Sequence, residues 1–300
     1  MQKKQVKKET KQKKTKSVGL ALGGGGARGL AHIGVIKVLR KAGIEIDYIA
    51  GTSMGALVGG FYAATQDIDL LEKLFSDISE KDMMPIRKML RAHNKLESPF
   101  RDNKPIIEML KSHIKGIPIE KCKIPFAAIA TDAKNGDMVV LKKGSLTDAI
   151  QASAALPMVF APVTVNGRLL SDGGLVDPVP ADVVRDMGAE YVIAIDVSSR
   201  WPDISEETIS IHGIKSIIAD ALPALEYQLV RRVIGEADVA LRPPVVHYHW
   251  FDFPEARDII KQGTEEITLH LKEIYKGTGY SEPKKTPIQK FIDFLFDDTL

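Results

Sequence analysis

The chain has 300 residues, of which 44% are hydrophobic and 27% are charged, and this composition is typical of a soluble globular protein with a sizeable core. Its one cysteine, Cys122, excludes an intrachain disulfide and a cysteine zinc site, and it fits a reducing compartment, so we expect a cytoplasmic protein. The longest mostly apolar stretch, residues 152–163, is too short to span a bilayer and contains two prolines, so no transmembrane helix is predicted.

The net charge of +2 is unevenly distributed. Residues 1–16 hold eight lysines and one glutamate, which leaves 33 basic against 38 acidic residues, or −5, in the rest of the chain. We expect a disordered tail that either attracts anionic lipid at the inner membrane surface or has no specific role. No apolar segment follows its lysines, so it is not predicted to be a secretory signal. Nucleic acid is not an expected partner, because the acidic body offers no basic face.

The first part of the chain alternates strand and helix patterns. An apolar run at 17–22 predicts a buried strand that leads into a glycine loop. Helical spacing follows over 27–43, with Gly43 as its C-terminal cap, and 44–51 predicts a second strand. Small residues over 53–65 predict a helix that can pack close to a sheet. This order is typical of a parallel sheet covered by helices.

The same alternation continues less regularly to about residue 278, so we predict one domain over 17–278. A helix is expected at 145–156, where Ser145 and Asp148 have the spacing of a capping box and Pro157 stops the helix. Further strands are predicted at 124–133, 137–144, 167–172, 189–197 and 237–243, and further helices at 180–188, 214–235 and 255–275.

Residues 279–300 form a C-terminal extension in which a short amphipathic helix is predicted. Apolar residues recur at helical spacing from Ile288 to Leu295, and Phe294 and Phe296 widen this face. Such a helix can lie in a membrane interface, fill a partner groove or pack back on the domain. We favour packing on the domain, because three aspartates in this segment would be repelled by anionic lipid.

The glycine loop at 23–29 is a candidate anion site. Gly24, Gly26 and Gly29 satisfy G-x-G-x-x-G between a predicted strand and a predicted helix, where backbone N–H groups are free. These groups suit a dinucleotide, with Asp47 placed to bind a ribose hydroxyl, or an oxyanion that develops during acyl transfer. The loop alone does not decide between the two.

Ser53 is a candidate nucleophile, because it lies at the centre of Gly51-Thr52-Ser53-Met54-Gly55, between a predicted strand and a small-residue helix. A nucleophile elbow holds its central residue in strained geometry and needs small residues two positions away on either side. Adjacent parallel strands would bring this turn and the glycine loop to the same edge of the sheet. The pattern therefore favours the oxyanion interpretation of the loop.

The base that would take the serine proton is less clear from the residues alone. Asp172 ends an apolar strand before two glycines, which would direct a carboxylate toward the same edge, although Asp-Gly-Gly is also a simple turn. One alternative is a Ser–Asp–His esterase of the α/β-hydrolase type that uses a later histidine, and another is a non-catalytic lipid- or nucleotide-binding module. The later histidines are His212, His247, His249 and His270.

Three blocks in this order resemble the signatures of the patatin-like phospholipase family: residues 24–29, 51–55 and 172–174. Residues 152–163 also resemble that family, and the similarity spans roughly 17–200. The resemblance implies an α/β/α sandwich with a mainly parallel sheet and hydrolysis of acyl esters of phospholipids or lysophospholipids. It also implies a Ser53–Asp172 dyad without histidine, and no metal or cofactor.

On this resemblance, Ser53 attacks the ester carbonyl, Asp172 takes its proton, and backbone N–H groups of the glycine loop bind the oxyanion. The expected oxyanion-hole residues are Gly24, Gly25 and Gly26, and the expected supporting residues are Arg28, Gly51, Gly55 and Gly173, with Arg28 either holding the loop or meeting a lipid phosphate.

Overall fold

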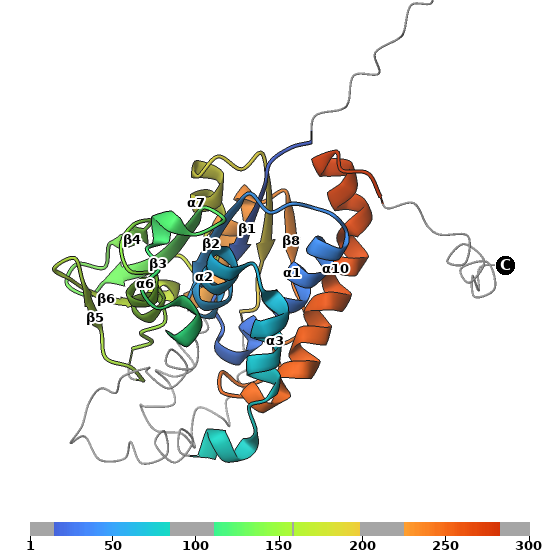
Figure 1. Ribbon diagram of the computed structural model, residues 1–300. Helices are drawn as coiled ribbons and strands as arrows, with labels where there is room; N and C mark the ends of the chain where they lie inside the picture. The colour runs from blue at the N-terminus through green and yellow to red at the C-terminus, as the bar shows by residue number, and fades with distance from the viewer. Residues whose placement is uncertain (1–14, 85–110, 158, 199–224, 283–300) are drawn as a thin grey trace, which may run out of the picture.

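The computed structural model describes residues 15–84, 111–157, 159–198 and 225–282, and it places an eight-stranded sheet between layers of helices (Figure 1). The hydrogen-bonded path through the sheet runs β5-β6-β3-β2-β1-β7-β8, and β4 also pairs with β3. The strands β3, β2, β1, β7 and β8 are parallel to one another. The strands β4, β5 and β6 are antiparallel to their neighbours. Their bounds are β1 Val18–Leu22, β2 Tyr48–Thr52, β3 Phe126–Asp132, β4 Met138–Leu141, β5 Val163–Val165, β6 Arg168–Asp172, β7 Tyr191–Ile195 and β8 Val239–Leu241.

Helices cover both faces of this sheet. Alternate residues of β1 belong to different apolar clusters, because successive side chains of a strand point to opposite faces. Leu20 belongs to the cluster that includes residues of α1, α2, α3 and α10, whereas Ala21 belongs to the cluster that includes Val184 of α7 and Val230. The predicted three-layer α/β/α sandwich is therefore confirmed. The bounds are α1 Ala31–Lys41, α2 Met54–Thr65, α3 Ile68–Ser76, α6 Leu146–Ser153, α7 Ala181–Asp186 and α10 Ala256–Thr278, and residues 225–233 are also helical.

Most predicted elements are present, with shifted ends. The helix expected over 27–43 opens as a 3-10 turn, η1 (Gly26–Leu30), and α1 is followed by Gly43 at φ 71°, as expected of a C-terminal cap. The Ser145 hydroxyl accepts a hydrogen bond from the Asp148 N–H, which confirms the predicted cap of α6. The helix α3 and the edge strand β5 are among the elements that were not predicted.

Some predictions fall outside the described residues. The lysine-rich tail up to residue 14, the segment 283–300 and residues 214–224 of the long predicted helix are among them. Their roles therefore stay predictions. Within the described part of the chain, no helix combines the length and the apolar character that a membrane crossing needs.

The strand β3 brings the two candidate catalytic segments together. Ala128 and Ile129 pair with both β2 and β4, and Ala130 pairs with both β4 and β6. A strand has only two edges, so β2 and β6 must share the edge of β3 that β4 leaves free. Thr52 of β2 pairs with Ile129, and Asp172 of β6 pairs with the next residue, Ala130. The end of β2 therefore meets the end of β6.

Candidate active site

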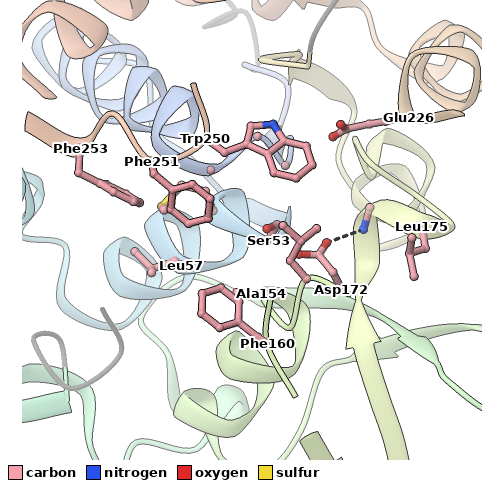
Figure 2. Close-up of a pocket in the computed structure, with 16 residues that line it drawn as sticks. Ser53, Leu57, Ala154, Phe160, Asp172, Leu175, Glu226, Trp250, Phe251 and Phe253 are labelled. Carbon is pink, nitrogen blue, oxygen red and sulfur yellow. Dashed lines mark hydrogen bonds between the residues drawn. The ribbon is translucent and has the colours of Figure 1, made fainter. Parts of the chain in front are cut away.

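A largely apolar pocket opens where β2, β6 and the glycine loop meet (Figure 2). Ser53 and Asp172 lie next to one another at its centre, and apolar side chains from several elements surround them (Figure 2). Such a pocket suits an apolar substrate with a few polar groups at one point. The other lining residues are Gly24, Gly25, Gly26, Met54, Leu57, Ala154, Leu156, Phe160, Gly174, Leu175, Glu226, Trp250, Phe251 and Phe253.

Ser53 occupies a strained turn between β2 and α2. Its φ is 55° and its ψ is −117°, a conformation that a residue with a side chain rarely adopts and that the surrounding structure must hold. The Ser53 N–H donates to Ser153 Oγ at 2.9 Å. The Thr52 hydroxyl donates to the Asp177 carbonyl at 2.8 Å. The backbone thus fixes Ser53 at the pocket, as a nucleophile elbow would.

Gly51 and Gly55 permit this turn because no space exists for larger side chains. A methyl group at Gly51 would lie 2.4 Å from the carbonyl oxygen of Gly55, and one at Gly55 would lie 2.0 Å from that of Leu22. Both distances are far below van der Waals contact. The close approach of α2 to the sheet therefore depends on these two glycines.

Gly55→Ala is expected to lower the free energy of unfolding by about 1–3 kcal/mol, because the added methyl forces the backbone of α2 away from β1. Gly235→Ala is the matched control, since a methyl there meets no atom within 4 Å. Urea unfolding of both variants checks the prediction. Equal stability of the two variants would show that α2 can shift without cost.

Asp172 is a buried carboxyl with one satisfied oxygen. Its Oδ1 accepts a hydrogen bond from the Gly174 N–H at 2.8 Å, and its Oδ2 has no partner at hydrogen-bond distance among the described residues. Burial raises the pKa of Asp172 to about 6, although the Gly174 N–H and the nearby Ser53 hydroxyl both lower it. A carboxyl with this pKa is ionised at neutral pH and basic enough to accept a proton.

Judged from the described residues, the glycine loop offers two unpaired N–H donors rather than the predicted three. The Gly24 N–H donates to the Pro178 carbonyl at 3.0 Å, so it is not available to an oxyanion, and including Gly24 as a donor was wrong. The N–H groups of Gly25 and Gly26 donate to no described residue. Both residues have positive φ, 156° and 58°, which favours glycine and directs these groups away from regular pairing.

Arg28 and His32 hold the loop from behind. Buried Arg28 does not line the pocket, and its Nε donates to the Gly25 carbonyl at 3.2 Å. His32 Nε2 lies 2.8 Å from the Gly23 carbonyl, and burial lowers the pKa of His32 to about 4. His32 is therefore neutral, and its Nε2–H donates to Gly23. Of the two predicted roles of Arg28, its position favours support of the loop.

Gly173 also has no space for a side chain. A methyl group there would lie 2.3 Å from the Ile129 carbonyl oxygen, so Asp172 can follow β3 closely only because a glycine comes next. The turn that carries Asp172 thus depends on a small residue, like the turn that carries Ser53.

No histidine lines the pocket in the described part of the chain. The ring of His113 packs against Phe61, and His270 lies near Glu266 and Glu273 on α10. His247 and His249 are exposed. The remaining histidines, 93 and 212, are outside the described residues.

Sequence reasoning missed four lining residues that come from late in the chain: Glu226, Trp250, Phe251 and Phe253. The Ala27 N–H donates to the Trp250 carbonyl at 2.9 Å, which ties the aromatic segment to the glycine loop. The aromatic run at 248–253 was a usable signal, because large apolar residues outside regular elements often line sites. Glu226 gave no such signal, since its environment depends on tertiary packing.

The described residues contain no group of three or more histidine, cysteine or acidic side chains placed to share a metal ion. Among the described lining residues, the pocket presents the Ser53 hydroxyl, the carboxyls of Asp172 and Glu226 and the backbone N–H groups of Gly25 and Gly26 within largely apolar walls. This arrangement suits nucleophilic acyl transfer with charge stabilised by the backbone.

Comparison with known proteins gives a consistent picture. The family model "Patatin-like phospholipase" matches residues 20–185. An uncharacterized NTE family protein of Mycobacterium tuberculosis is 40% identical over 181 residues, which cover 60% of this chain and 49% of that protein. Human patatin-like phospholipase domain-containing protein 6 is 34% identical over 280 residues, covering 92% of this chain and 18% of that protein.

The chain thus spans about half the length of the mycobacterial relative and a smaller share of the human one. Among solved structures, VipD from Legionella pneumophila superposes with a TM-score of 0.50 at 13% identity, over 87% of this chain and 67% of VipD, which supports the fold alone. The match of the family model includes the glycine loop, the Ser53 elbow and Asp172, and it extends over more than half of the sequence. The chain belongs to the patatin-like phospholipase family.

Proposed function

We propose that this protein is a serine acyl hydrolase that cleaves fatty acyl esters of phospholipids or lysophospholipids. The observation that carries the proposal is the position of the strained Ser53 beside the buried Asp172 at the centre of an apolar pocket. Family membership supports a lipid ester as the substrate. The phospholipase A and lysophospholipase types share this chemistry and differ in the alcohol half that the site must accept.

The reaction would proceed in two halves. Ser53 Oγ attacks the ester carbonyl carbon while its proton passes to Asp172, and the carbonyl oxygen becomes an oxyanion that accepts hydrogen bonds from Gly25 and Gly26 N–H. The C–O bond to the alcohol then breaks, and Asp172 returns the proton to the leaving alcohol. Asp172 then takes a proton from water, the resulting hydroxide attacks the acyl-enzyme, and the proton passes from Asp172 to Ser53 Oγ as the fatty acid is released.

The substrate class follows from the pocket walls. Leu57, Phe160, Phe251 and Phe253 present apolar surface to an acyl chain of the bound lipid (Figure 2). Access to such lipids requires peripheral contact with a membrane or micelle, for which the lysine-rich tail and the C-terminal extension are the candidate segments.

The experiment that tests this proposal is labelling with a fluorescent fluorophosphonate, which reacts with activated serines. Wild type is expected to label, and Ser53→Ala is not, because the nucleophile is absent. His212→Ala, His247→Ala, His249→Ala and His270→Ala are the controls for a Ser–Asp–His mechanism, and all four should label at the wild-type rate. A folded wild type that does not label, or a histidine variant that loses labelling, would contradict the dyad. Hydrolysis of lipid esters with different alcohol halves then identifies the substrate.

A further inference from the structure

Glu226 is a second carboxyl in the pocket, and the proposed mechanism does not use it. Among the described lining residues, it is the only ionisable side chain besides Asp172. It comes from the helical segment 225–233, more than fifty residues after Asp172 in the sequence. Figure 2 shows it apart from Leu57 and Phe160, which are on the proposed acyl side. It therefore belongs to the other side of the pocket, where the alcohol half of an ester would lie.

Two glycines define how close Glu226 is to the reacting groups. A methyl group at Gly24 would lie 3.4 Å from Ser53 Cβ and 3.6 Å from Glu226 Oε1, so these two atoms are no farther apart than the sum of the two distances. A methyl group at Gly174 would lie 3.2 Å from Asp172 Oδ1 and 4.0 Å from Glu226 Oε1. One bound ester group can thus span the space between Ser53 and Glu226.

The charges around Glu226 come from three elements. Arg28 of η1 is the one cation near it among the described residues, and Asp172 at the end of β6 and Asp196 after β7 are the anions. Burial raises the pKa of Glu226 to about 8, Arg28 opposes that rise, and the two aspartates add to it. Two carboxyls in one apolar pocket resist ionising together, so their pKa values move apart. At neutral pH Asp172 is the base and Glu226 is a neutral acid.

We propose that Glu226 is a substrate-contacting acid, whose neutral carboxyl donates a hydrogen bond to an oxygen in the alcohol half of the bound ester. This inference rests on the proposed function. The acyl chain occupies the apolar walls and the carbonyl oxygen faces the glycine loop, so the alcohol half remains for Glu226. A neutral carboxyl has an O–H to donate, whereas a carboxylate can only accept. Ionised Glu226 would also place a negative charge beside the developing oxyanion.

The test is the pH profile of kcat/KM from pH 5 to 10, with a monoacylglycerol and a lysophospholipid of the same acyl chain. For both substrates, wild type should fall by about 10- to 100-fold above pH 8, as the negative charge of Glu226 appears near the oxyanion. Glu226→Gln keeps a neutral donor, so it should stay within a few-fold of wild type at pH 7 and remain level to pH 10. Glu226→Leu has no donor, so it should be about 10-fold slower at pH 7 and also level at high pH.

Glu236→Gln is the matched control, because it removes an exposed carboxylate that follows the same helical segment outside the pocket, and it should follow wild type. The proposal is overturned if kcat/KM of the wild type stays level between pH 7.5 and 9.5. This measurement uses the wild-type protein alone. The proposal is also overturned by a Glu226→Gln profile that falls like wild type, or by full activity of Glu226→Leu at pH 7. Failure of the proposed function looks different, because wild type would then neither hydrolyse lipid nor label at Ser53.

Discussion

Replacement of Asp172 by asparagine is expected to lower kcat/KM at pH 7 by about 10²–10⁴-fold, since the variant keeps the shape of the side chain but cannot accept the serine proton. Asparagine can still accept the Gly174 N–H through its Oδ1, so the turn should survive. In wild type, kcat/KM should rise as pH increases through about 6, because the carboxyl must be ionised to act as a base. The rise should be absent from the residual activity of Asp172→Asn.

The same substitution is expected to stabilise the fold at alkaline pH. The pKa of Asp172 is raised in the folded state, so the folded protein holds this proton more tightly than the unfolded chain and loses stability as pH rises from about 4 to 6. Asparagine removes that loss. Thermal unfolding at pH 8 should show a higher Tm for Asp172→Asn. The expected gain in the free energy of unfolding is on the order of 1–3 kcal/mol.

Asp177→Asn is the matched control. Asp177 is also buried, and burial raises its pKa to about 7, but it does not line the pocket. Its replacement should raise stability at pH 8 in the same way, with much less effect on kcat/KM. If Asp172→Asn and Asp177→Asn had equal activities, Asp172 could not be the base.

Gly26→Ala is expected to lower kcat by about 10²–10³-fold, the usual cost of losing an oxyanion donor. A methyl group there would lie 2.5 Å from the Trp250 carbonyl oxygen, and the φ of 58° is strained for alanine. The loop must therefore move, and its N–H groups would no longer face the reacting oxygen. Single-turnover kinetics with a chromogenic ester should show the loss in the acylation step, with little change in KM.

Gly136→Ala separates backbone strain from loss of the donor. Gly136 has a φ of 77°, and a methyl there meets no atom within 4 Å, so its substitution strains a turn without touching the pocket. It should lower Tm slightly and leave kcat unchanged. If Gly26→Ala kept wild-type kcat, the oxyanion role of the loop would be ruled out.

The local parts of the site could be predicted from the sequence. Gly51, Ser53 and Gly55 stand between an apolar strand and a small-residue helix, and this short-range pattern is enough to indicate the turn. For Asp172 the local pattern left a simple turn as an alternative, and its role as the base was predicted only from the family resemblance. The glycine loop was recognised as a donor site, because free N–H groups follow from its place before a helix.

The remaining features depend on contacts between distant segments. The Gly24 N–H is taken by Pro178, a partner that no local pattern indicates. Glu226 and Trp250 enter the pocket only through the packing of the second half of the chain. The helix α3 had a local signal, since Asp67 accepts the Leu70 N–H as an N-terminal cap, and this signal was overlooked.

The shared edge of β3 has a consequence for synthesis of the protein. A ribosome would complete the Ser53 turn more than a hundred residues before Asp172 is added, and between them it must make β3, on which both segments align. A nascent chain that already carries the serine therefore lacks the partner that would activate it. On the proposed mechanism, the capacity to hydrolyse an ester would arise only after β6 has been made and has paired with β3.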